Sequence, residues 1–395
     1  MRACLALASV LGIVGCSSDP GPAAFDAAGA DAAGVDAGGV RPDARAGADA
    51  AVTDAAAGLD AGEPPADAGP PRRTFVYVGL ASGDLVTLDG ATLAEVARTR
   101  TGNFPSFVTA SPDGTHLYAV HESANEVVAI AVSADGTTRV VSRQSAPGGP
   151  THVSIDRGAR FVFTASYGSG EVGVYPIAAD GTVGARAFGE IAGSHAHAIV
   201  ADAASAYVYV PCLGIDRVVG YTLDTTTGRL TRVGESMGAG DGPRHLALSP
   251  DGARAYVIDE LSSEIDVFDV LGTGLLTRLS TVSTLPAGFT GANSGAEILA
   301  TSDGRHVYAS NRGHDSVAVL ATGGDTLTLV EHEPSGGGHP RSMALSVDER
   351  RLLVANRDSN NVTVLDVDAV TGALAFVRTL AVDAQPYFVG ELLAP

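Results

Sequence analysis

The stretch PRHLALSPDGARAYVIDELSSEIDVFDV, residues 243–270, decides the fold expected for this chain. It holds three apolar runs rich in valine, isoleucine and aromatic residues, and the turn Pro250-Asp251-Gly252 separates the first two. Short runs of this composition, bounded by turn-forming residues, are typical of antiparallel β-strands. A glycine-bearing turn and a weaker fourth run follow, so the stretch predicts a unit of four strands.

The same pattern recurs along residues 72–395, with its first strand preceded each time by one marker residue. Successive markers are 45 to 52 residues apart. The markers are Pro105, Pro150, Ala196, Pro243, Gly295, Pro340 and Pro386. Four-stranded repeats of this length stack radially as propeller blades.

The two ends of the repeat region are complementary. After Pro386 only one strand-like run remains, YFVGELL, whereas three runs without a first strand stand before the first marker: TFVYVGL, DLVTLDG and LAEVARTR. We therefore predict an all-β fold, a seven-bladed β-propeller with four antiparallel strands per blade. In it the C-terminal strand joins the N-terminal blade and closes the ring. A β-sandwich or a β-helix would not explain this divided unit.

The first sixteen residues, MRACLALASVLGIVGC, resemble a bacterial lipoprotein signal. Arg2 gives a short positive region, and the apolar run over residues 5–14 is too short to span a bilayer. The resemblance implies that Cys16 is lipidated, and Ser17 after it implies sorting to the outer membrane. A plain secretory signal cut nearby is the alternative.

Residues 17–71 consist mainly of alanine, glycine, aspartate and proline, with no periodic apolar face. Such a segment cannot bury enough surface to offset its chain entropy, so we expect a disordered tether. It has ten acidic residues and two arginines, and the remaining chain is acidic as well. This argues against nucleic acid as a partner, and the only membrane contact we expect is through the lipid on Cys16.

Comparison of the repeats separates scaffold from candidate site. Two positions differ between blades: the residue after each marker, and the residue that ends the second strand. The first position holds Ser106, Thr151, His197, Arg244, Ala296, Arg341 and Tyr387, and the second Glu122, Tyr167, Leu213, Glu260, Arg312 and Arg357. Because neighbouring strands are antiparallel, both positions lie at one edge of the blade. They therefore predict an anion-binding funnel around the central channel.

Less specific interpretations stay open for these residues. A charged residue at a strand end is commonly a solvated loop residue. His152, His195 and His245 are interpreted as hydrogen-bonded structural histidines. Cys212 has no second cysteine to pair with in the mature chain, and no spacing typical of a metal or cofactor site is present.

Several motifs, among them GPRHLALSPDGARAYVIDELSSEIDVF and DGRHVYASNRGHDSVAVL, resemble the seven-bladed propeller lactonase family. That family includes bacterial cycloisomerase-type 6-phosphogluconolactonases and fungal carboxymuconate cyclases. The resemblance runs from about Phe75 to Leu393. It departs from the family in the first blade, where the usual glycine-threonine-tyrosine motif is reduced to residues 78–81, VGLA.

The resemblance implies a catalytic set of His197, Arg244, Glu260 and Arg312. Glu260, held ionised by the arginines, would act as base and His197, titrating near neutrality, as acid, or the two would exchange roles. The arginines would bind the developing oxyanion. Further substrate contacts are expected from Arg341, Glu122, Tyr167 and Arg357.

We therefore expect a monomeric lactone hydrolase that needs no cofactor and no metal, and that acts on a small anionic lactone or sugar acid. Export is at odds with a phosphogluconolactone, which is a cytoplasmic metabolite. The alternative is a non-catalytic cell-surface propeller that binds an anionic ligand or a partner protein through the same funnel.

Overall fold

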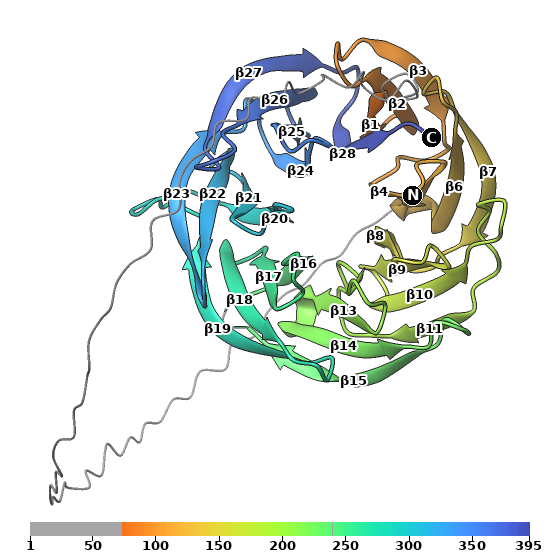
Figure 1. Cartoon of the computed structure of the whole chain (residues 1–395), viewed down its shortest axis with the longest axis horizontal. Helices are drawn as coiled ribbons and strands as arrows, with labels where there is room; N and C mark the ends of the chain where they lie inside the picture. Colours follow the sequence, from red (N-terminus) through yellow and green to blue (C-terminus); the bar gives the residue numbers. More distant parts are fainter. Residues whose placement is uncertain (1–72, 239) are drawn as a thin grey trace, which may run out of the picture. The chain divides into compact units, whose positions relative to one another are not determined.

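The computed structural model describes residues 73–238 and 240–395. The expected signal sequence, Cys16 and the tether, residues 1–71, lie outside the described residues. Within them, seven sheets of four antiparallel strands form a ring, as expected from the repeats (Figure 1). Among these residues there is no helix long and apolar enough to cross a membrane.

Each sheet is built from strands close in sequence, apart from the first, which takes its inner strand from the C-terminus. In chain order from the ring-closing blade, the strands are β28 Pro386–Leu393, β1 Thr74–Leu80, β2 Asp84–Asp89 and β3 Glu95–Arg100; β4 Phe107–Ala110, β5 His116–His121, β6 Glu126–Val132 and β7 Thr138–Ser145; β8 Pro150–Ile155, β9 Phe161–Ser166, β10 Glu171–Pro176 and β11 Phe188–Ile191; β12 Val200–Ala201, β13 Tyr207–Cys212, β14 Arg217–Leu223 and β15 Leu230–Met237; β16 Pro243–Leu248, β17 Arg254–Asp259, β18 Glu264–Val270 and β19 Leu276–Ser283; β20 Ser294–Ala300, β21 His306–Arg312, β22 Ser316–Gly323 and β23 Thr326–Pro334; β24 Pro340–Leu345, β25 Arg351–Asn356, β26 Asn361–Val367 and β27 Leu374–Ala381. Single turns of 3-10 helix, Glu122–Ala124 and Leu213–Ile215, follow β5 and β13.

The ring closes through β28, which pairs with β1 from Thr74↔Leu393 to Leu80↔Pro386. This confirms the closure expected from the divided repeat unit. In Figure 1 the first strands of the sheets, such as β16, β20, β24 and β28, lie nearest the middle of the ring. The residues after the markers therefore surround the axis of the ring, the place expected for the central channel.

The core lies between neighbouring blades, whose apolar faces pack against each other. One cluster joins Phe161 and Val174 of one blade to Val208 and Tyr221 of the next. The aromatic residues that recur in the second strands are all buried: Tyr118, Phe163, Tyr209, Tyr256 and Tyr308. Two of them also link blades, because the hydroxyl of Tyr308 donates to the Gly372 carbonyl at 2.9 Å and that of Tyr118 to the Gly181 carbonyl at 3.3 Å. Each such bond stabilises the fold by about 1 kcal/mol.

A one-residue bulge at the start of the inner strands positions the site. In β16, Pro243 pairs with Asp259 but His245 pairs with Ile258, which leaves Arg244 unpaired. The same shift occurs after Pro150 and after Pro340. A bulge inserts an extra residue on one strand and re-aims its side chain.

One inner strand is shorter than the sequence predicted. The run at residues 197–202 was expected to be a strand, but β12 covers only Val200–Ala201. Before it, Ala196 and His197 still bond to β13. The backbone of Ile199 bonds instead to side chains of β8: its carbonyl accepts from the Ser154 hydroxyl at 2.6 Å, and its N–H donates to His152 Nδ1 at 3.4 Å. Contacts with the neighbouring blade thus replace part of the ladder.

Candidate active site

The channel mouth is formed by the residues after the markers and the residues that end the second strands. The pairing of the first and second strands brings the two positions close together. Pro243 pairs with Asp259, which directly precedes Glu260, and Pro340 pairs with Asn356, which directly precedes Arg357. Gly295 takes the marker position beside Glu260. Its N–H donates to the Glu260 carbonyl at 3.0 Å, and a Cβ there would lie 2.7 Å from the Asp259 carbonyl oxygen. Glycine is therefore needed for this close approach.

The four residues with an expected catalytic role meet at the Glu260 carboxylate. Its Oε2 lies 3.0 Å from Nε of Arg244 and 3.9 Å from Nε2 of His197. Its Oε1 lies 3.1 Å from Nη2 of Arg312. The carboxylate is 23% exposed, so it remains open to the channel while the arginine side chains are 1% and 8% exposed.

Both arginines are anchored on the backbone of β20, which belongs to the blade after that of Arg244 and to the blade of Arg312 itself. Arg244 Nη1 donates to the Ala296 carbonyl at 2.5 Å, and Arg312 Nη2 donates to the Gly295 carbonyl at 2.6 Å. Burial, followed by the charges of Arg312 and Arg341, lowers the pKa of Arg244 to about 9, against the opposing effects of Glu260 and Glu297. Glu260 therefore stabilises the charge of a guanidinium in an unfavourable environment.

His197 differs from the expectation of a group that titrates near neutrality. Burial, followed by the charges of Arg244 and Arg341, holds its pKa well below the ordinary value. The imidazole is therefore neutral at neutral pH, which does not fit the expected role as an acid in the imidazolium form. Its backbone N–H donates to the Pro211 carbonyl at 2.9 Å, and Tyr167 packs edge-on against its ring.

The remaining predicted residues lie around the same mouth. The Arg341 guanidinium lies 5.1 Å from the centre of the Tyr387 ring. Burial raises the pKa of Glu122, whereas the charges of Arg341 and Arg244 lower it. Arg357 is turned to Asp358, to which its Nε donates at 2.7 Å, so it is less available to a ligand than Arg341.

A buried layer below the mouth was missed as part of the site. His245 Nδ1 lies within hydrogen-bond distance of Glu297 Oε1, at 2.7 Å, and both side chains are buried. The His245 ring also contacts the rings of His197, His152 and Phe107 at centroid distances of 5.2, 5.3 and 5.5 Å. Phe107 and His245 belong to inner strands three blades apart, so this contact crosses the channel.

This layer is the floor of the site. The three histidines interpreted as structural have different partners: His245 pairs with Glu297, His152 accepts from the Ile199 N–H, and His195 stacks on Tyr167 at 4.2 Å. His152, His245 and Glu297 could have been identified from the sequence, because each is the second residue after a marker. The comparison of the repeats did not use that position. In the described part of the chain, no three His, Cys, Asp or Glu side chains are grouped to hold a metal ion.

The model of the seven-bladed β-propeller lactonase family matches residues 82–389, nearly the whole ring. The chain belongs to this family. The 6-phosphogluconolactonase of Pectobacterium carotovorum is 33% identical over 290 residues, 71% of this chain and 86% of that protein. The 6-phosphogluconolactonase of Bacillus subtilis is 32% identical over 317 residues, 76% of this chain and 90% of the relative.

Solved structures agree with the assignment of this lactonase-family chain. The periplasmic gluconolactonase of Pseudomonas aeruginosa superposes with a TM-score of 0.73 at 27% identity, over 82% of this chain and all of that one. A protein from Lactobacillus plantarum gives a TM-score of 0.74 at 28% identity, over 81% of this chain and 99% of the other.

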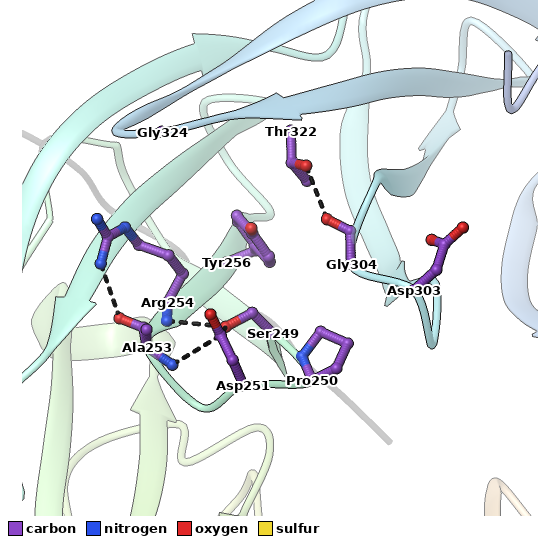
Figure 2. Close-up of a pocket in the computed structure, with 10 residues that line it drawn as sticks. All are labelled: Ser249, Pro250, Asp251, Ala253, Arg254, Tyr256, Asp303, Gly304, Thr322 and Gly324. Carbon is purple, nitrogen blue, oxygen red and sulfur yellow. Dashed lines mark hydrogen bonds between the residues drawn. The ribbon is translucent and has the colours of Figure 1, made fainter. Parts of the chain in front are cut away.

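A pocket of about 360 Å³ lies between two blades of the lactonase fold, at the opposite edge from the channel mouth (Figure 2). It is lined by the turns that join first to second strands, at residues 249–254 and 303–304, and by Thr322 and Gly324. Figure 2 shows polar groups around the pocket bonded to one another, such as the Thr322 hydroxyl of β22 to the Gly304 carbonyl of the turn. An equivalent pocket of about 310 Å³, lined by Ser111, Arg160 and Gly181 among others, recurs between two other blades. Its recurrence marks it as a product of blade packing.

Proposed function

We propose that this protein hydrolyses a sugar-type lactone at the channel mouth. The observation that carries the proposal is the Glu260 carboxylate with His197, Arg244 and Arg312 around it, at 3.0 to 3.9 Å. A base beside fixed positive charges is the arrangement that ester hydrolysis needs. Relatives named 6-phosphogluconolactonase and gluconolactonase support the same substrate class.

In the proposed reaction Glu260 accepts a proton from water as the water oxygen attacks the lactone carbonyl carbon. The carbonyl oxygen becomes an oxyanion beside the guanidinium groups of Arg244 and Arg312, which stabilise its charge. Collapse of the tetrahedral intermediate breaks the bond to the ring oxygen. That oxygen takes the proton from Glu260, which gives the open hydroxy acid. Neutral His197 orients the water.

Substitution of the base tests this assignment. We expect Glu260→Gln and Arg244→Ala each to lower kcat/KM for a reactive lactone by at least about 100-fold, because each removes a group that acts in the transition state. A panel of δ- and γ-lactones followed in a pH-stat gives the rates. Arg254→Gln, at the pocket on the opposite edge, is the matched control and should keep full activity.

Two results would contradict the proposal. Wild-type rates in both variants would remove Glu260 and Arg244 from the chemistry. If no lactone is opened while a sugar acid still binds, the protein is a non-catalytic binding propeller.

We further propose that the protein is exported and held in the cell envelope by a lipid on Cys16, with Ser17 directing it to the outer membrane. The signal-like first sixteen residues support this, and a similar solved structure is a periplasmic gluconolactonase. Cys16→Ser should abolish labelling by radioactive fatty acid and release the protein from the membrane fraction. Labelling that persists in the variant would contradict the anchor.

A further inference from the structure

The channel mouth has two chemically different halves. His197, Arg244, Glu260 and Arg312 come from three consecutive blades, and both arginines there face Glu260. The other half is built from the next three blades of the ring, with Arg341 after the start of β24, Tyr387 in β28 and Glu122 after β5. No residue of this half takes part in the chemistry proposed above.

Arg341 is a cation without an anionic or hydrogen-bonding partner in the described part of the chain. Among residues 73–238 and 240–395, its guanidinium has no ion pair or hydrogen bond, and its Nε is enclosed without an acceptor. It lies over the Tyr387 ring, and Phe104 supports that ring at 4.7 Å. The aromatic face fixes the position of the guanidinium while its remaining N–H groups stay unbonded.

The electrostatics of this half favour an incoming anion. Burial and the charges of Arg312 and Arg357 lower the Arg341 pKa, whereas Glu122 opposes them. Burial raises the pKa of Glu122, which favours its neutral form. An unpaired and largely desolvated cation is costly unless a ligand supplies the counter-charge.

We propose that Arg341, supported by Tyr387, binds an anionic substituent, a phosphate or a carboxylate, at the end of the lactone remote from the ring carbonyl. The inference rests on the proposed lactonase function, because the ring carbonyl is placed at Glu260. The contact is made equally in the ground state and the transition state. It therefore lowers KM and leaves kcat unchanged.

The experiment compares three lactones on the whole protein: uncharged glucono-δ-lactone, its 6-phosphate, and glucarolactone, which carries a carboxylate. We expect wild type to favour one or both charged lactones in kcat/KM. Arg341→Gln should lower kcat/KM for the favoured anion by about 10- to 100-fold through KM, as for the loss of one charge-assisted contact. It should leave glucono-δ-lactone unaffected. Arg341→Lys should restore part of the loss, and the control Arg254→Gln should change nothing.

The outcomes separate this inference from the proposed function. Equal kcat/KM for charged and uncharged lactones in the wild type, or an equal loss on all three in Arg341→Gln, overturns the inference and leaves the lactonase function standing. If no lactone is opened, the function fails. Calorimetric titration with gluconate and 6-phosphogluconate then decides the inference: a loss of affinity in Arg341→Gln for the phosphate alone supports it, and equal affinities overturn it. Preference for the phosphate or for the carboxylate identifies the substituent.

Discussion

Glu297 is a residue whose charge depends on its surroundings. Burial raises its pKa to about 7, against the opposing charge of Arg244, and its carboxyl contacts His245. Burial also holds the pKa of His245 well below its ordinary value. One proton is therefore shared by the pair below neutral pH and is lost near pH 7. This adds a negative charge beneath Arg244.

The raised pKa of Glu297 predicts how the stability of the protein depends on pH. The glutamate pKa is about 4.3 in the unfolded chain and about 7 in the folded protein. The folded state therefore binds the proton more tightly, and this contribution to stability is lost as pH rises from about 4.3 through 7. Glu297→Gln has no such proton. The free energy of unfolding of wild type relative to the variant should fall between pH 5 and pH 8, measured by urea denaturation. A difference in unfolding free energy that stays constant between pH 5 and pH 8 would contradict this prediction.

At the scale of the strand, the residue directly before Glu260, Arg312 and Arg357 has a shared structural function. In two blades it is asparagine: the Asn311 side-chain amide donates to the Thr284 carbonyl at 2.8 Å, and that of Asn356 to the Ser335 carbonyl at 2.9 Å. Each bond fixes the loop that enters an inner strand. The blade of β17 has Asp259 there, buried, and its Oδ2 has no hydrogen-bond partner among the described residues. Burial, with Asp266 next in effect, raises the Asp259 pKa to about 9.

Asp259→Asn should therefore stabilise the protein. The asparagine amide fits the same position in two other blades and carries no charge. The aspartate pKa is about 3.9 when unfolded and about 9 when folded, so the wild type loses stability as pH rises through this window. The gain in Tm from Asp259→Asn should consequently be larger at pH 8 than at pH 5.

Asp251→Asn, in the same blade, is the matched control. The Ser249 hydroxyl donates to the Asp251 carboxylate at 2.6 Å and the Ala253 N–H at 3.0 Å, and these bonds lower the Asp251 pKa. This substitution should lower Tm. An Asp259→Asn protein less stable than wild type at pH 8 would refute the interpretation of Asp259.

Much of the arrangement of the strands could be predicted from the sequence. Strand order, ring closure and the two variable positions follow from apolar periodicity, which repeats over seven blades. That periodicity placed Arg244 and Glu260 at one edge. It does not show a one-residue bulge, because unpairing Arg244 leaves the apolar pattern of β16 unchanged. Glu297 stands at a repeat position that the comparison of the blades did not use, and the low pKa of His197 depends on its burial and on arginine charges brought in by other blades.

At the scale of the whole molecule, β28 holds the ring together. It pairs with β1 along the length of that strand, where Val76 and Val78 are fully buried. Val389 of β28 packs into the same cluster. Full burial of one such side chain stabilises a fold by roughly 1.5 to 3 kcal/mol.

A chain that ends at Gln385 should therefore lose cooperative thermal unfolding or show a Tm lower by more than about 10 °C, since several kcal/mol are removed. Circular dichroism measures the transition. A synthetic peptide of residues 384–395 added to the shortened chain should restore part of the loss. A shortened chain with the wild-type Tm would show that closure contributes little.

The pairing of β1 with β28 also sets an order of events in the cell. Among the described strands β1 is made first and β28 last, so the ring cannot close before β28 has been made. A prematurely terminated product keeps β1 as an open sheet edge, with backbone N–H and C=O groups that another truncated copy can pair with. β28 therefore both completes the ring and covers a sheet edge that would otherwise be open to pairing between copies.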